Sequence, residues 1–264
     1  MESVFSSTPI KVLSLNTQNA KIVEKKTIAG FVINNNEYEE NEAKNNNMAS
    51  FLTASGADII ALQECTANGV VANIKGRMTN ASSFEVIEYN GIGPALIYNK
   101  EVFDCEEYGQ WRLAEKGNED DGEYQRDAVY AKLVRKEDGA VIIAVSTHFD
   151  YLNDRAKAQA AKLIENLNTY YPGVRTVIMG DFNFEGQYGP FPNLESASFV
   201  NAQKIAETKV NEGAYTHKSS SGTEKVLDFI YLKGFKVTVH EVKTDLDGKS
   251  VSDHRPVYAE IVIK

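Results

Sequence analysis

The sequence has only two cysteines, Cys65 and Cys105, and no cluster of cysteines and histidines with the spacing of a zinc site. Two cysteines cannot form the disulfide framework that holds small secreted domains together. We therefore expect two buried free thiols, with a single bridge as the alternative. The fold must then depend on a hydrophobic core, which a chain of 264 residues is long enough to bury.

Long apolar runs are also absent, since no stretch approaches the length of a membrane span. The first residues lack a basic segment followed by an apolar stretch, so a cytoplasmic location is expected unless a signal has been removed. No internal repeat and no linker divides the sequence, which predicts one domain over residues 1–264. We expect this domain to be a monomer.

Basic runs are scarce, and 37 acidic against 28 basic residues give a net charge of −9. This balance argues against a protein that holds nucleic acid mainly through a broad basic surface. It does not exclude a nuclease, because a bound metal ion can reverse the field of a carboxylate-rich cleft.

What the sequence does contain is a series of short β-branched and aromatic runs, which predicts about ten strands. They cover residues 11–15, 59–62, 84–89, 95–98, 128–134, 141–147, 176–179, 226–232, 237–242 and 257–263. Helical periodicity is clearest over residues 154–167, where Asn153 can cap, and weaker over 47–55 and 66–76. The combination predicts an α/β (α+β) fold of two packed sheets with helices on their outer faces. The asparagine-rich stretch 23–47 is interpreted as a surface insertion, over about residues 24–47, in the form of a loop.

Polar residues follow the predicted strands at the points where the strands end, so their side chains can project from a rigid scaffold into a cleft. Any one of them is more often a turn former, a helix cap or a packed residue. Their recurrence favours a functional site. They are Asn16, Glu64, His148, Asp150, Asp181, Asn183, Asp228, Asp253 and His254.

Hydrolysis of a phosphate ester gives a chemical reason for this set. The reaction needs a hard cation, and Mg²⁺ or Mn²⁺ prefers one or two carboxylates with several waters, which Glu64 with Asp253 or Asn16 can supply. It also needs a base for the attacking water. His254 is a candidate, with Asp228 to fix its tautomer.

Charge that develops on the phosphoryl oxygens needs hydrogen-bond donors already in position. Asn183, His148 and Arg126 are the candidates for this role.

The order and wording of these motifs resemble the endonuclease/exonuclease/phosphatase superfamily, from about residue 11 to residue 263. The most specific motifs are GDFN (180–183), LDFIY (227–231) and SDHRP (252–256). The resemblance implies a four-layer α/β/β/α sandwich of two mostly antiparallel sheets flanked by helices, with the active site at one rim. It also implies that Glu64 is the principal metal ligand, with Asn16 beside it and Asp253 on the metal side.

For the reacting groups, the resemblance implies that Asp181 orients the attacking water and that Asn183 contacts the phosphate. Asp228 and His254 are expected to form a carboxylate–imidazole pair. His148 is expected to face the scissile phosphate. These roles are carried over position by position from the motifs.

A finer resemblance is to the pancreatic-type deoxyribonucleases and to bacterial members with a THFD motif. It places Arg126 at the site and suggests that Glu88 pairs with His148. Two alternatives stay open, since Glu85 could be that partner and Glu88 could be a plain surface residue. Tyr151 stands where the bacterial members commonly have histidine. This difference puts in doubt a second-metal role for Asp150.

Two other functional classes compete with an active phosphohydrolase. One is a catalytically silent relative that binds a phosphate-bearing ligand, and the other is an unrelated β-rich binding domain. The retained polar residues argue against the silent relative, and the order of the motifs argues against the unrelated binding domain. The substrate stays open among a small phosphate ester, a lipid head group and nucleic acid, with a small-footprint deoxyribonuclease as the close alternative.

Overall fold

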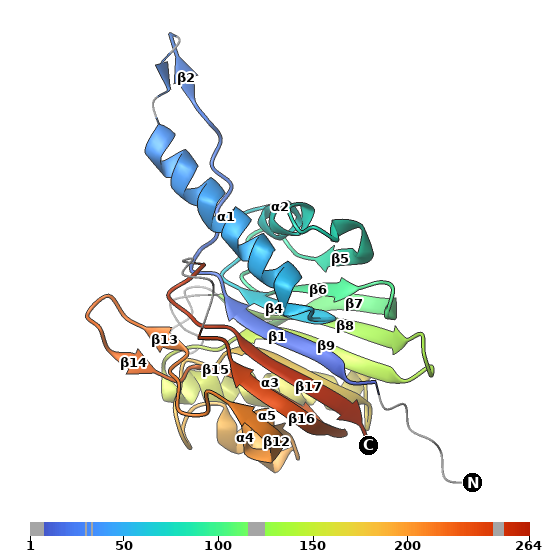
Figure 1. Cartoon of the computed structure of the whole chain (residues 1–264). Coiled ribbons are helices and arrows are strands. Elements are labelled where there is room, and N and C mark those ends of the chain that lie inside the picture. Colours follow the sequence, from blue (N-terminus) through green and yellow to red (C-terminus); the bar gives the residue numbers. More distant parts are fainter. Residues whose placement is uncertain (1–7, 30, 33, 116–124, 245–250) are drawn as a thin grey trace.

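Two large β-sheets pack face to face in the computed structural model, which describes residues 8–29, 31–32, 34–115, 125–244 and 251–264 (Figure 1). The first sheet has the strand order β12 (Ala206–Val210), β16 (Phe235–Val242), β17 (Val257–Ile263), β1 (Ile10–Asn16), β4 (Ile59–Gln63), β6 (Ala95–Asn99) and β5 (Phe84–Ile87). The second has the order β11 (Val200–Asn201), β15 (Asp228–Lys233), β10 (Arg175–Asp181), β9 (Val141–His148), β8 (Arg126–Arg135) and β7 (Phe103–Ala114).

Helices cover the outer faces of both sheets. Their bounds are α1 (Asn35–Ser55), α2 (Val70–Gly76), α3 (Asn153–Tyr170), α4 (Phe191–Ser196) and α5 (Ala202–Ile205). α1 and α2 cover the first sheet, and α3 and α4 cover the second (Figure 1). The four-layer α/β/β/α sandwich is therefore confirmed. None of the described helices is both long and apolar enough to cross a membrane.

Strand β1 illustrates why these sequences form sheets with two buried faces. Ile10 and Val12 point into the core between the sheets, while Leu13 and Leu15 point toward the helices α1 and α2. A strand that is buried on both faces has a nearly continuous apolar sequence instead of an alternating one. The same reasoning accounts for β4 and β9, whose residues are almost all buried.

Two predictions about local structure were wrong, and one long strand was not foreseen. α1 begins at Asn35 and not at residue 47, so much of the expected surface loop is helix, and the hairpin of β2 (Thr27–Ile28) and β3 (Phe31–Val32) precedes it. Strand β7 was not predicted, because it is largely exposed and lacks an apolar pattern. Asn153 does not cap α3, since its Oδ1 accepts a hydrogen bond from the backbone N–H of Gly189 instead.

Parallel pairing brings the ends of several strands to one rim of the sandwich. β1 runs parallel to β4 in the first sheet, and β9 runs parallel to β10 in the second. The carboxyl ends of parallel strands lie at the same edge of a sheet, so the polar residues after them gather there.

Both cysteines are free, with Cys65 buried and Cys105 partly buried.

Candidate active site

Three neighbouring strands of the second sheet carry polar residues at this rim. β10 ends at Asp181, which lies opposite Asp228 of β15 and opposite His148 of β9. Gly180 permits this pairing, because a Cβ atom at that position would lie 1.9 Å from the carbonyl oxygen of Thr147. The register thus brings two carboxylates and an imidazole together, and it explains the glycine of the GDFN motif.

The carboxylate of Asp181 lies at the centre of the cluster. Its Oδ2 accepts a hydrogen bond of 3.0 Å from Asn16 Nδ2 and lies 3.5 Å from His148 Nε2 and 3.7 Å from His254 Nε2. Its Oδ1 accepts a hydrogen bond of 2.9 Å from the backbone N–H of Asn183. Burial, together with the negative charge of the neighbouring carboxylate on β15, raises the pKa of Asp181 to about 7. A carboxyl group with this pKa can take up or release a proton near neutral pH.

His254 and Asp228 form the expected carboxylate–imidazole pair. His254 Nδ1 lies 2.8 Å from Asp228 Oδ2, and both side chains are buried. Burial works against the charged imidazole, but the negative charge of Asp228 and the hydrogen bond to it raise the pKa of His254 to about 9. The ring therefore carries a proton at neutral pH and presents positive charge beside Asp181.

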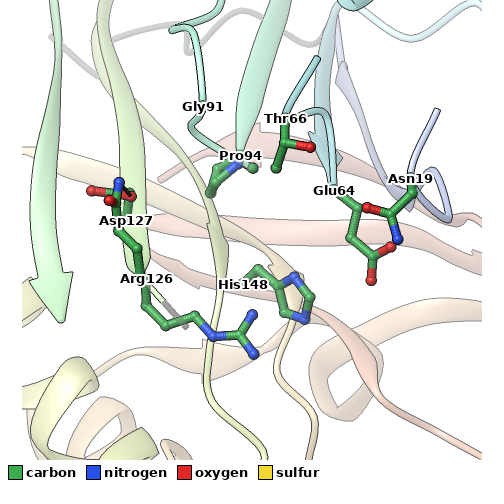
Figure 2. Close-up of a pocket in the computed structure, with 10 residues that line it drawn as sticks. Asn19, Glu64, Thr66, Gly91, Pro94, Arg126, Asp127 and His148 are labelled. Atoms are coloured by element: carbon green, nitrogen blue, oxygen red, sulfur yellow. Dashed lines mark hydrogen bonds between the residues drawn. The ribbon is translucent and has the colours of Figure 1, made fainter. Parts of the chain in front are cut away.

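His148 has the opposite electrostatic environment. Burial, and then the positive charge of Arg126, hold the pKa of His148 well below its usual range, so this imidazole is neutral at pH 7. Its Nε2 accepts a hydrogen bond of 2.9 Å from Asn183 Nδ2, which also donates to the carbonyl oxygen of Phe149. The guanidinium of Arg126 extends toward the ring of His148 (Figure 2).

Glu64 and Asp253 lie on the other side of the cluster, close to the end of β1. Asn16 Nδ2 donates a hydrogen bond of 2.9 Å to Glu64 Oε1, and Glu64 has a left-handed backbone with φ of 62°. The turn before Asp253 is held at β1 because Ser252 Oγ donates to the carbonyl oxygen of Asn16 at 2.6 Å. Burial lowers the pKa of Lys44, and the charges of Asp253 and Glu64 both oppose that shift. Both carboxylates therefore act on the charge of Lys44.

A cavity of about 330 Å³ opens between Glu64 and the side chains of Arg126 and His148 (Figure 2). It is lined by Asn19, Glu64, Thr66, Gly91, Gly93, Pro94, Gln125, Arg126, Asp127 and His148. Glu64 contributes a carboxylate at its wall, with Asn16 hydrogen-bonded to that carboxylate. Oxygen donors next to open space suit a hard divalent cation, which keeps several of its waters in protein sites.

Two of the candidates, Glu88 and Asp150, hold backbone N–H groups at the starts of helices. Glu88 accepts hydrogen bonds from the backbone N–H groups of Val71 and Ala72 at 3.0 and 3.2 Å, so its carboxylate is engaged at the first turn of α2 instead of pairing with His148. Asp150 is buried, and its Oδ1 accepts a hydrogen bond from the backbone N–H of Leu152, directly before α3. Its carboxylate thus helps to begin that helix.

Some residues of this region were not foreseen from the sequence. Asn19, Thr66 and Gln125 line the cavity, but they are ordinary loop residues with no pattern that marks them. The ring of His217 lies against the ring of His254, with centroids 4.6 Å apart and the ring planes inclined by 44°. The chain has only four histidines, so the scarcity of this residue was the one signal that could have drawn attention to His217.

Comparisons with known proteins agree with this architecture. The structure is similar to an endonuclease/exonuclease/phosphatase family protein from Bacteroides thetaiotaomicron (TM-score 0.80, 19% identity, 98% of this chain and 97% of that one). It is also similar to a mannosyl-6-phosphatase of the same organism (TM-score 0.78, 18% identity, 96% of this chain and 100% of that one). A third similar structure is the catalytic domain of human Nocturnin with bound sulfate (TM-score 0.70, 18% identity, 99% of this chain and 97% of that one). Identities this low show the shared fold alone.

Among curated proteins, no sequence matches this chain. The sequence pattern of one family, in contrast, matches residues 13–254, which is most of the chain. This match spans the strand ends at which the buried carboxylates and imidazoles meet. The chain belongs to the Endonuclease/Exonuclease/phosphatase family.

Proposed function

We propose that this chain hydrolyses a phosphate ester, a monoester or a diester, and that it requires Mg²⁺ or Mn²⁺. The observation that carries the proposal is the environment of Asp181, whose carboxylate meets Asn16, His148 and His254 from three other strands or turns. A purely structural carboxylate has no need of two imidazoles and a raised pKa. Family membership supports the reaction class.

The cation is assigned to Glu64, with Asn16 beside it and Asp253 on the same side. When bound, it supplies positive charge for the non-bridging oxygens of the phosphate. The assignment is supported by oxygen donors at a cavity wall, which suit a hard divalent ion.

The protein's own groups account for the remaining needs of the reaction. Asp181, with a pKa of about 7, accepts the proton of the attacking water. The protonated ring of His254, held by Asp228, stabilises the negative charge that develops on the phosphoryl oxygens. This division differs from the expectation that His254 is the base, because an imidazole with a pKa of about 9 holds its proton at neutral pH.

The phosphate is held, on the side opposite Glu64, by neutral His148 together with Asn183 and Arg126. Their positions at or near the cavity wall support this role, since Arg126 and His148 both border it. Retention of every one of these groups argues against a silent relative.

A small substrate is favoured over a long nucleic acid. A second hollow of about 790 Å³ shares Asn19 and Thr66 with the cavity and extends over the segment before α1. Its wall carries Lys21 and Lys26, but also Glu24 and Glu37, so it offers no net positive charge to a phosphate backbone. The mannosyl-6-phosphatase with the same fold acts, by its name, on a sugar phosphate. The additional room still favours a nuclease of small footprint as the second candidate.

A direct assay of purified protein with Mg²⁺ tests the proposal. The substrates are aryl phosphates, sugar phosphates, inositol phosphates, sphingomyelin, single-stranded RNA and plasmid DNA. We expect turnover of a small ester that changes little with added salt and stops on chelation. Salt-sensitive cleavage of DNA without turnover of small esters would select the nuclease, and turnover that survives exhaustive chelation would exclude the metal mechanism.

A further inference from the structure

The hairpin of β13 (His217–Lys218) and β14 (Glu224–Lys225) lies against the turn that carries Asp253 and His254. His217 forms an antiparallel bridge with His254, and the backbone N–H of Lys218 donates to the carbonyl oxygen of Asp253 at 3.1 Å. Residues directly opposite each other in an antiparallel pair present their side chains on the same face. The hairpin therefore fixes a second imidazole next to His254.

Asp253 completes a group of three potential ligands. His217 Nε2 lies 3.8 Å from Asp253 Oδ2, which is too long for a hydrogen bond. One ligand atom each from His217, Asp253 and His254 can be chosen so that all lie within 4.8 Å of one another. Two atoms that ligate the same zinc ion, each at about 2.0–2.2 Å, are separated by roughly 3–4 Å. The 3.8 Å between His217 Nε2 and Asp253 Oδ2 is within this range. The His254 ligand atom lies within 4.8 Å of both, so a small movement of side chains would close the group around an ion.

The two imidazoles are prepared for this role in different ways. His254 Nδ1 is engaged by Asp228 at 2.8 Å, which leaves Nε2 as its coordinating atom once the cation has displaced the proton that this ring carries at neutral pH. A carboxylate on the far nitrogen is the usual support of a metal-binding histidine. His217 Nδ1 is buried and has no hydrogen-bond partner within the part of the chain that the structure describes. Nothing there fixes the tautomer of His217, so its Nε2 is able to present a lone pair.

We propose that His217, Asp253 and His254 form a binding site for a borderline divalent cation such as Zn²⁺, which does not use Glu64 but adjoins the Glu64 side at Asp253, and that its occupancy stops catalysis. Imidazole nitrogen suits Zn²⁺ and Co²⁺, whereas Mg²⁺ prefers oxygen ligands. A cation on His254 Nε2 takes the atom that faces Asp181, 3.7 Å away, and so removes His254 from the reaction. This second part rests on the proposed function, while cation binding does not.

Binding is measured first, without substrate, by titrating metal-free protein with Co²⁺ and recording the visible absorption of the bound ion. The wild-type chain is expected to bind Co²⁺ in the presence of excess Mg²⁺, and Zn²⁺ is expected to displace it. His217→Gln should weaken Co²⁺ binding by at least about tenfold, as loss of one ligand does. Lys218→Gln is the matched control, because it alters the same hairpin at a side chain on the other face.

A second variant, Asp253→Asn, should weaken Co²⁺ binding as well, and circular dichroism establishes that each variant is folded. Equal Co²⁺ affinity in the wild-type chain and in both folded variants would overturn the site. Loss of Co²⁺ binding in the presence of Mg²⁺ would also overturn the site, because Co²⁺ would then occupy the Mg²⁺ site at Glu64.

Inhibition is measured next, by adding Zn²⁺ to the Mg²⁺-activated protein. We expect His217→Gln to raise the Zn²⁺ concentration for half-inhibition by at least about tenfold. Equal inhibition of both proteins would overturn the inhibitory role. A chain that binds Co²⁺ through His217 and turns over none of the substrates would instead contradict the proposed function and leave the cation site established.

Discussion

At the scale of single residues, the raised pKa of Asp181 lowers the stability of the folded chain at neutral pH. Its pKa is about 7 in the folded chain against an ordinary 3.8, because burial and a neighbouring carboxylate disfavour its charge. The folded chain therefore holds a proton that the unfolded chain loses, and this group lowers the free energy of unfolding as pH rises from about 4 to 7. Asp181→Asn should reduce turnover at least about a hundredfold.

The same variant should also lose part of the pH dependence of stability. Chemical denaturation of metal-free protein at several pH values between about 4 and 7 measures this. We expect the decline in the free energy of unfolding to be smaller in Asp181→Asn than in the wild-type chain. Superimposable pH profiles would show that Asp181 ionises normally and is unsuited to act as the base.

His254 and Asp228 give a second residue-level prediction with its own pH window. The pKa of His254 is raised from 6.5 to about 9, so the pair contributes stability that is fully present below pH 6.5 and is lost as pH rises through 9. Asp228→Asn should lower the pKa of His254 by more than one unit, as followed by NMR of the ring protons. Asp154→Asn is the control, because that carboxylate is 96% exposed. An unchanged titration of His254 in Asp228→Asn would refute the pairing.

At the scale of elements, Arg77 at the end of α2 connects that helix to α1. Arg77 donates two hydrogen bonds, of 2.8 and 2.9 Å, to the two carboxylate oxygens of Glu42, and a further one to Asn46. Bidentate pairs that are partly buried contribute more than exposed ion pairs. Glu42→Gln should therefore lower the free energy of unfolding by about 1 kcal/mol.

Urea denaturation measures this change. Glu85→Gln is the matched control, because the Glu85–Lys100 pair is about half exposed and should contribute little. Equal effects of the two substitutions would mean that α1 is held by its apolar contacts alone, such as those of Met48 and Leu52.

The same elements show what the sequence could predict. Strands β1, β4 and β9 were predictable because burial on both faces leaves continuous apolar runs. The first half of α1 and strand β7 were not, since an exposed element has no apolar period to reveal it.

Some residues of the candidate site were likewise predictable from the sequence and others were not. Asp181 and Asp228 were predictable because they end or begin buried strands. The place of His217 depends on a short hairpin whose position is set by tertiary contacts with the turn at His254, and no local pattern encodes it. The capping role of Glu88 was missed for the same reason.

At the scale of the whole molecule, the net charge of −9 and the carboxylates and imidazoles grouped at one rim predict that the metal-free chain binds divalent cations. An ion that binds only the folded chain stabilises it, by about 2.7 kcal/mol at a hundred times its Kd, so Mg²⁺ or Mn²⁺ should raise Tm by about 5 °C or more. Glu64→Gln should abolish most of this rise and the activity together, whereas Glu85→Gln should keep both. Calorimetry with added Mg²⁺, Ca²⁺ and NaCl at matched ionic strength separates specific binding from charge screening. A rise in Tm that NaCl reproduces, or that Glu64→Gln retains, would place the cation away from Glu64.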